Sequence, residues 1–114
     1  MVEMKKTGVA PKDHIHFLYF LASCSVTNEQ RKAVLSKITP GQIRVLTEIF
    51  LNFRYGKIQV SDRDENSLRR KKKVIRKLTT RATTQADRKD IILNNFVLIT
   101  KLLQTYLEYI VTKL

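Results

Sequence analysis

A run of cations between Ser67 and Arg81 is the part of the sequence best suited to chemistry. The segment SLRRKKKVIRKLTTR carries eight lysines and arginines and no acid. These cations are Arg69, Arg70, Lys71, Lys72, Lys73, Arg76, Lys77 and Arg81. Such a cluster neutralises phosphates and releases counterions, but it offers few side chains suited to reading base edges. The pattern therefore predicts sequence-independent binding of a polyanion through its phosphates; we expect double-stranded DNA, and RNA stays open as an alternative.

The positive charge of the whole chain is concentrated in this region. The 114 residues include 22 lysines and arginines against 10 acids, a formal net charge of +12. Residues 57–90 hold twelve of the basic and five of the acidic residues, so they contribute seven of these charges. Arg88 and Lys89 extend the predicted nucleic-acid site. Two further alternatives remain open: the basic face docks on an acidic patch of a capsid or host protein, or it only keeps the domain soluble.

Apolar residues within the cation run indicate a folded helix and not a loose tail. Leu68, Ile75, Leu78 and Ala82 fall near one line of a helix, with basic or polar residues between them. Acidic residues placed just before the run suit the positive end of a helix dipole. They are Asp62, Asp64 and Glu65. We expect one basic helix with a narrow apolar seam.

No other residues form a pattern typical of catalysis, and we expect neither an enzyme nor a cofactor. His14 and His16 would point to different sides of a helix, so no metal site is predicted. Cys24 is the single cysteine; we expect an inert, buried thiol in a reducing, intracellular compartment. Aromatic residues in apolar stripes are expected to pack in the core and not to stack on bases. They are Phe17, Tyr19, Phe20, Phe50, Phe53 and Phe96.

The hydrophobic periodicity predicts an all-α domain, a compact bundle of about five helices over residues 12–114, with residues 1–11 as a flexible segment. Two capping boxes mark helix starts, at Thr27 with Gln30 and at Thr39 with Gln42. Gly56 supplies a left-handed stop. The fourth, basic helix follows, and Thr84 caps the last helix, which runs to the end of the chain.

The last helix is expected to be the spine of the bundle. Its inner stripe consists of Ile92, Phe96, Ile99, Leu103, Tyr106 and Ile110. Polar residues interrupt it, so it is not predicted to span a membrane. A homodimer seam along this helix stays open, and membrane activity is the less favoured alternative.

A succession of motifs also resembles a known family. In chain order they are FLASC, EQRKAVL, ITPGQIRVLTEIFLN, YGKIQV, LRRKKKVIRKLTTR and DRKDIIL. Their order and spacing are similar to those of small basic proteins encoded by animal Polinton-type elements, adintoviruses and related DNA viruses. The resemblance covers about two-thirds of the chain, from Phe17 to Leu93.

The resemblance implies a virion-interior role comparable to that of the small basic core peptides of adenoviruses. It implies genome packaging, with the host nucleus and the virion interior as locations. The matching residues are the helix cations and, further on, Arg88 and Lys89, while Asn52 and Gly56 match the end of the preceding helix. Relatives often carry a Gly-Gly-Phe turn and an apolar tail after the basic segment. This chain has Asn94, Asn95 and Phe96 inside a continuous helical pattern, which favours an integral fifth helix over a membrane-active tail.

Overall fold

The computed structural model describes residues 14–112, and within them the fold is helical with no strand. The helices are α1 (Ile15–Ala22), α2 (Asn28–Leu35), α3 (Pro40–Arg54), α4 (Asp62–Arg70), α5 (Lys72–Thr79), α6 (Gln85–Asn94) and α7 (Phe96–Thr112). The predicted all-α class is therefore confirmed for this part of the chain. The predicted number of five helices is wrong, because two expected helices are each divided. Residues 1–11 and the expected helix start at Lys12 lie outside the described residues.

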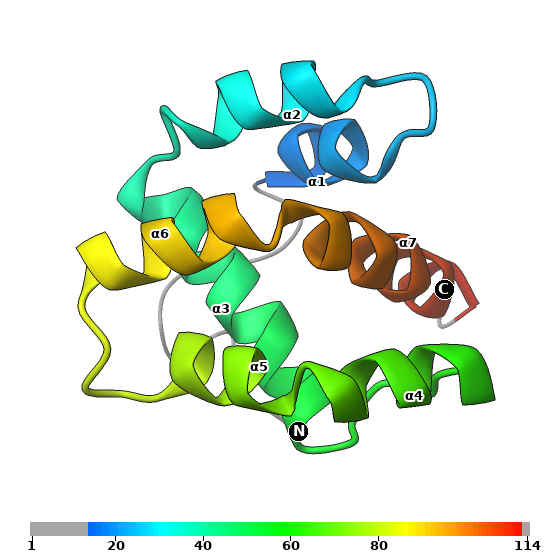
Figure 1. Ribbon diagram of the computed structural model, residues 1–114. Coiled ribbons are helices and arrows are strands. Elements are labelled where there is room, and N and C mark those ends of the chain that lie inside the picture. The colour runs from blue at the N-terminus through cyan, green and yellow to red at the C-terminus, as the bar shows by residue number, and fades with distance from the viewer. Residues whose placement is uncertain (1–13, 113–114) are drawn as a thin grey trace.

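The helices are arranged around α3, which crosses the middle of the molecule (Figure 1). α5 and α6 pack against α3, and α7 packs against α1, α2 and α6. α4 and α5 lie end to end along one edge, away from α1 and α2 (Figure 1). The Cα radius of gyration is 13.0 Å, close to that expected for a compact domain of about 100 residues.

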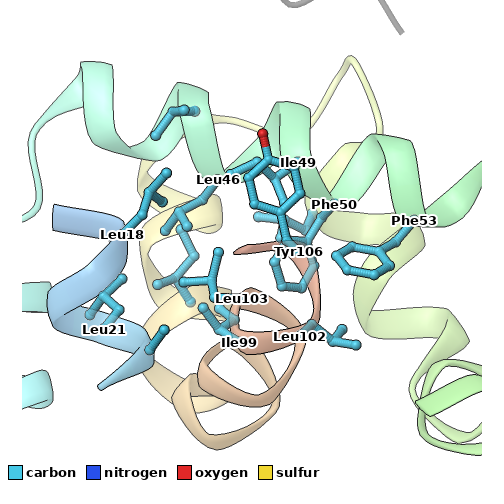
Figure 2. Close-up of a cluster of buried hydrophobic side chains, with 14 of the residues drawn as sticks. Leu18, Leu21, Leu46, Ile49, Phe50, Phe53, Ile99, Leu102, Leu103 and Tyr106 are labelled. Atoms are coloured by element: carbon cyan, nitrogen blue, oxygen red, sulfur yellow. The ribbon is translucent and has the colours of Figure 1, made fainter. Parts of the chain in front are cut away.

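The core forms where α1, α3 and α7 converge (Figure 2). Its fully buried members include Leu18, Leu21, Leu46, Ile49, Phe50, Ile99, Leu102 and Leu103. The Phe50 and Phe53 rings meet edge to face, with centroids 5.8 Å apart. α7 thus buries its apolar face inside the chain, and pairing of two copies through this helix stays a prediction. None of the helices within residues 14–112 combines the length and hydropathy needed to cross a membrane.

The predicted helix starts are found at the expected residues. Thr27 Oγ1 accepts from the Gln30 backbone N–H at 3.1 Å, and Gln30 Oε1 accepts from the Thr27 N–H at 2.9 Å. Thr39 and Gln42 form the same reciprocal pair at the start of α3. Gly56 has a φ of +67°, a conformation that glycine adopts without strain. Both capping boxes and the left-handed stop are confirmed.

The expected single basic helix is divided at Lys71, whose φ of −104° and ψ of 21° are not helical. α5 is held on α3 by buried Ile75 and Leu78. α4 is instead held on α7, where Lys101 Nζ donates to Ser67 Oγ at 2.9 Å. Because the two halves are fixed to different helices, the helical backbone is interrupted between them at Lys71. Contacts with other helices thus break the helix at Lys71, although the sequence pattern predicts one continuous helix.

The expected continuous last helix is divided at Asn95, with a φ of −131° and a ψ of 29°. The Asn95 side chain donates through Nδ2 to the Ile91 carbonyl at 2.8 Å. Asparagine favours such local bonds over a helix interior, which accounts for the break. The expectation of a continuous helix through Asn94 and Phe96 is wrong.

Three smaller expectations are also wrong. Cys24 is exposed, because it lies in the connector between α1 and α2 and not on a buried helical face. Tyr19 is half exposed, since it lies on the outer side of α1. Ala82 is exposed in the turn after α5 and takes no part in the apolar seam, because α5 ends at Thr79.

Glu48 is a buried acid on α3, only 8% exposed, and burial raises the pKa of its carboxyl above 4.5. The folded protein therefore holds the proton more tightly than the unfolded chain, and stability falls as pH rises from about 4.5 through the folded pKa. We expect Glu48→Gln to raise the melting temperature at pH 7, because the desolvated charge is removed. Circular-dichroism melts should show this gain disappearing near pH 4.

The exposed Glu108 supplies the control for this experiment. Glu108→Gln should leave the melting temperature nearly unchanged at pH 7. A Glu48→Gln variant that is no more stable than wild type at pH 7 would contradict the prediction.

Candidate nucleic-acid interface

Most of the predicted site residues lie at the surface along α4, α5 and the turn that follows. Exposed side chains are those of Arg69, Arg70, Lys71, Lys72, Lys73, Arg76, Lys77 and Arg81. Arg88 and Lys89, on α6, are half-buried. α4 and α5 lie along one edge of the molecule (Figure 1), and we call the eight exposed cations of these helices and of the residues next to them the basic edge.

α5 presents its cations in a fixed geometry because its other face is buried. Ile75 is 4% exposed and Leu78 is 1% exposed, and both belong to the main core. At 3.6 residues per turn, Lys73 and Lys77 lie one turn apart and directly opposite this buried face. Their ammonium groups therefore project from the helix toward solvent.

α4 is positioned by polar contacts more than by apolar ones. Ser61 caps its start, where Ser61 Oγ accepts from the Asp64 N–H at 3.2 Å. Thr105 Oγ1 donates to Asp64 Oδ2 at 2.5 Å, and Lys101 is bonded to Ser67 as described above. Leu68 is half-buried against the core. These contacts fix α4 along α7 and leave Arg69 and Arg70 on the outside.

The end of α5 is held by hydroxyl groups and by one arginine. Thr80 Oγ1 donates to the Arg76 carbonyl at 2.5 Å, and Thr83 Oγ1 donates to the Lys77 carbonyl at 2.6 Å. Arg88 Nη2 donates to the Thr80 carbonyl at 2.9 Å. The Arg88 Nε group is buried without a hydrogen-bond partner. Arg88 is thus engaged in joining α6 to the end of α5, and only part of its guanidinium faces solvent.

Few acids neutralise the basic edge. Glu65 and Arg69, one turn apart on α4, form the single ion pair found within residues 14–112, with N and O atoms 3.7 Å apart. Both side chains are largely exposed, and such pairs contribute little to stability. The other cations of the edge face solvent with their charge uncompensated, which favours binding of a polyanion.

Among the grooves that border α4, two combine cations of the basic edge with aromatic residues. One lies beside the breaks at Lys71 and Asn95, has a volume of about 730 Å³, and includes Arg70, Lys71 and Lys101 in its lining. The other lies between the end of α3 and the α4–α5 pair, with a volume of about 520 Å³. Its lining combines cations of the basic edge with Arg54 and Tyr55.

Arg54 and Tyr55 were not predicted as site residues. Both are exposed, and Arg54 Nη1 donates to Thr79 Oγ1 at 3.1 Å, joining the end of α3 to the end of α5. The sequence contained a partial signal, since a cation and an aromatic residue directly precede the Gly56 stop. Their proximity to α5 depends on the tertiary fold.

The two histidines do not contribute to a metal site in the described structure. Within residues 14–112, no group of three or more histidine, cysteine, aspartate or glutamate side chains is arranged to hold a metal ion.

Comparison with known protein families, with characterised proteins and with solved structures finds no match. Function is therefore inferred from the residues of the basic edge.

Proposed function

We propose that this protein binds double-stranded DNA without sequence preference, through contacts between the basic edge and phosphates. The observation that carries the proposal is a set of eight exposed cations on α4, on α5 and in the residues that adjoin these two helices. The protein acts by binding and neutralisation, not by catalysis.

The dimensions of the basic edge suit a duplex. α4 and α5 together have a length of about 25 Å at 1.5 Å per residue. Over that length, duplex DNA presents roughly 15 phosphate charges, of which one side can be contacted. The cations are therefore numerous enough to neutralise the facing phosphates, while long, flexible lysine and arginine side chains provide no fixed pattern for base recognition.

We extend the proposal to condensation of a genome in a virion core. This context follows from the resemblance to the small basic proteins of Polinton-type elements and adintoviruses. It places the protein in the host nucleus during assembly and in the virion interior afterwards.

A titration of duplexes with unrelated sequences at several salt concentrations tests the proposal. With about six phosphates contacted, the slope of log affinity against log salt should be about −5. The different duplexes should bind within a few-fold of one another, because phosphates carry no base information. Fluorescence anisotropy of labelled 20-mers provides the measurement.

Two results would contradict duplex binding: no binding at low salt, or binding insensitive to salt. Competition with polyglutamate tests the alternative that the partner is an acidic protein and not DNA. If polyglutamate of equal charge displaces the duplex fully at equal concentration, docking on an acidic protein is favoured over DNA.

A further inference from the structure

The groove between the end of α3 and the α4–α5 pair differs in character from the outer surface of the basic edge. We call it the Tyr55 groove. Its volume of about 520 Å³ falls within the range of about 300–1,000 Å³ typical of small-ligand sites. The outer cations Lys73 and Lys77 are not part of its lining. A ligand in this groove would therefore meet a different set of atoms from a ligand lying across the outer surface.

The inner surface of the groove is apolar. Phe53 and Ile75 are each about 95% buried, with exposures of 5% and 4%, and they contribute their remaining surface to the groove. Leu68 lines it from α4 and is half-buried. When a flat organic group covers this apolar surface, the surface is removed from water, and its burial favours binding.

Tyr55 supplies an aromatic ring that is accessible to such a group. Its side chain is 58% exposed, whereas the Phe50 and Phe53 side chains of the same helix are buried. Next to Tyr55, the positive φ of Gly56 turns the chain, and a Cβ placed at Gly56 would meet no atom within 4 Å. Apart from its two chain neighbours, no residue therefore fills the space beside Gly56, and the Tyr55 side chain next to it is largely accessible.

Cations surround this apolar and aromatic surface. Arg69, Lys72 and Arg76 line the groove from α4 and α5. Arg54 lies with its Cζ atom 5.6 Å from the centre of the Tyr55 ring and is fixed by its bond to Thr79. Glu65 is the one acid in the lining, and it is paired with Arg69. The groove thus has a net positive charge beside a surface suited to a planar ring.

We propose that the Tyr55 groove binds an unpaired nucleotide of single-stranded DNA, with its base against the Tyr55 ring and its phosphates at Lys72 and Arg76. A nucleotide is the ligand that joins a planar, poorly solvated ring to a phosphate. Base–aromatic stacking of this kind tolerates every base, because each has a π-face. Bases inside a duplex are stacked on one another and cannot cover Tyr55.

The inference goes beyond duplex binding, because its ligand is a separated strand. The inference rests on the proposed function in one respect. Lys72 and Arg76, which would bind the phosphates of the nucleotide, also belong to the basic edge. Duplex DNA would lie on the outer cations, and unpaired segments or strand ends would enter the groove.

Substitution of Tyr55 tests the proposal with two probes, labelled oligothymidine and a labelled duplex of equal length. Tyr55→Leu should weaken oligothymidine binding about tenfold, because it removes the stacking surface. Duplex binding should change less than twofold. Tyr55→Phe keeps the ring and should retain affinity for both probes. Tyr19→Leu removes the other half-exposed tyrosine, on α1, and should change neither affinity.

A second measurement uses the unmodified protein and does not depend on the folding of any variant. A single strand of abasic sites, with the same length and charge, should bind about tenfold more weakly than oligothymidine. Equal affinity for the abasic strand and oligothymidine would overturn the proposal. So would a Tyr55→Leu variant that loses neither affinity, or loses both to the same extent.

These results are separable from the test of duplex binding. A protein that binds duplex with a steep salt dependence but does not distinguish oligothymidine from the abasic strand retains the proposed function and lacks the nucleotide site. A protein that binds oligothymidine through Tyr55 but binds no duplex at low salt retains the nucleotide site and lacks the proposed function.

Discussion

Replacement of Lys73, Lys77 and Arg81 by glutamine is expected to weaken duplex binding about 100-fold at low salt. Each exposed charge near a phosphate contributes about 1 kcal/mol in water, and three such losses give about 3 kcal/mol. The slope of log affinity against log salt should become less steep by about 3 units, because three fewer counterions are released. None of the three side chains is buried, so the fold should be unaffected. Fluorescence anisotropy across a salt series measures both effects.

A matched control removes the same charges from the other end of the molecule. Lys32, Lys37 and Arg44 are also two lysines and one arginine, and all three are exposed, on or near α2 and the start of α3. Their replacement by glutamine lowers the net charge equally but should weaken binding only a few-fold. Equal losses for the two triple variants would mean that net charge, and not the arrangement of the basic edge, determines affinity.

The parts of the fold that could be predicted from the sequence are those fixed by neighbouring residues. The capping boxes at Thr27 and Thr39 are determined within four residues, and the Thr84 cap also lies where expected. Gly56 needs no tertiary contact to adopt a positive φ. Apolar periodicity likewise identified Leu78 and Leu103 as buried. These features follow from local chemistry.

The two helix breaks were missed for different reasons. At Asn95 a local signal exists, since asparagine bonds readily to its own backbone, but the apolar stripe continues on both sides and favours one unbroken helix. At Lys71 no local signal exists. The break there follows from the contact of Ser67 with Lys101 on α7 and of Leu78 with the core, which join residues far apart in the chain.

For the candidate site, too, some features could be predicted from the sequence and others depend on the fold. The cations of the basic edge were predicted correctly as exposed, because lysine and arginine are rarely buried. Arg31 shows the limit of this rule: it is 7% exposed, and its Nε donates to the Leu21 carbonyl at 2.8 Å. The Tyr55 groove could not be predicted, since it brings Tyr55 close to Lys72 only after Gly56 turns the chain. Residue type therefore gives the charge of the site, whereas the fold gives its shape.

Leu78→Ala is expected to lower the free energy of unfolding by about 3 kcal/mol, within the range of about 2–5 kcal/mol for large-to-small changes in a core. Leu78 is 1% exposed on α5, so its removal leaves a cavity where α5 joins the core. The Leu78→Ala variant also tests whether the cation run is a folded helix or a flexible tail. If α5 is part of the cooperative core, loss of Leu78 must destabilise the whole domain. Urea denaturation followed by circular dichroism measures the change.

Leu68→Ala is the matched control, because Leu68 is only half-buried on α4 and its loss should cost about half as much. A larger loss of unfolding free energy for Leu78→Ala than for Leu68→Ala would show that the basic edge is attached to the core mainly through α5. A Leu78→Ala variant as stable as wild type would show that α5 is only loosely attached, and the cations would then behave as a flexible tail. With α5 firmly attached, the cations retain one arrangement before binding. Less conformational freedom is then lost when they meet a row of phosphates.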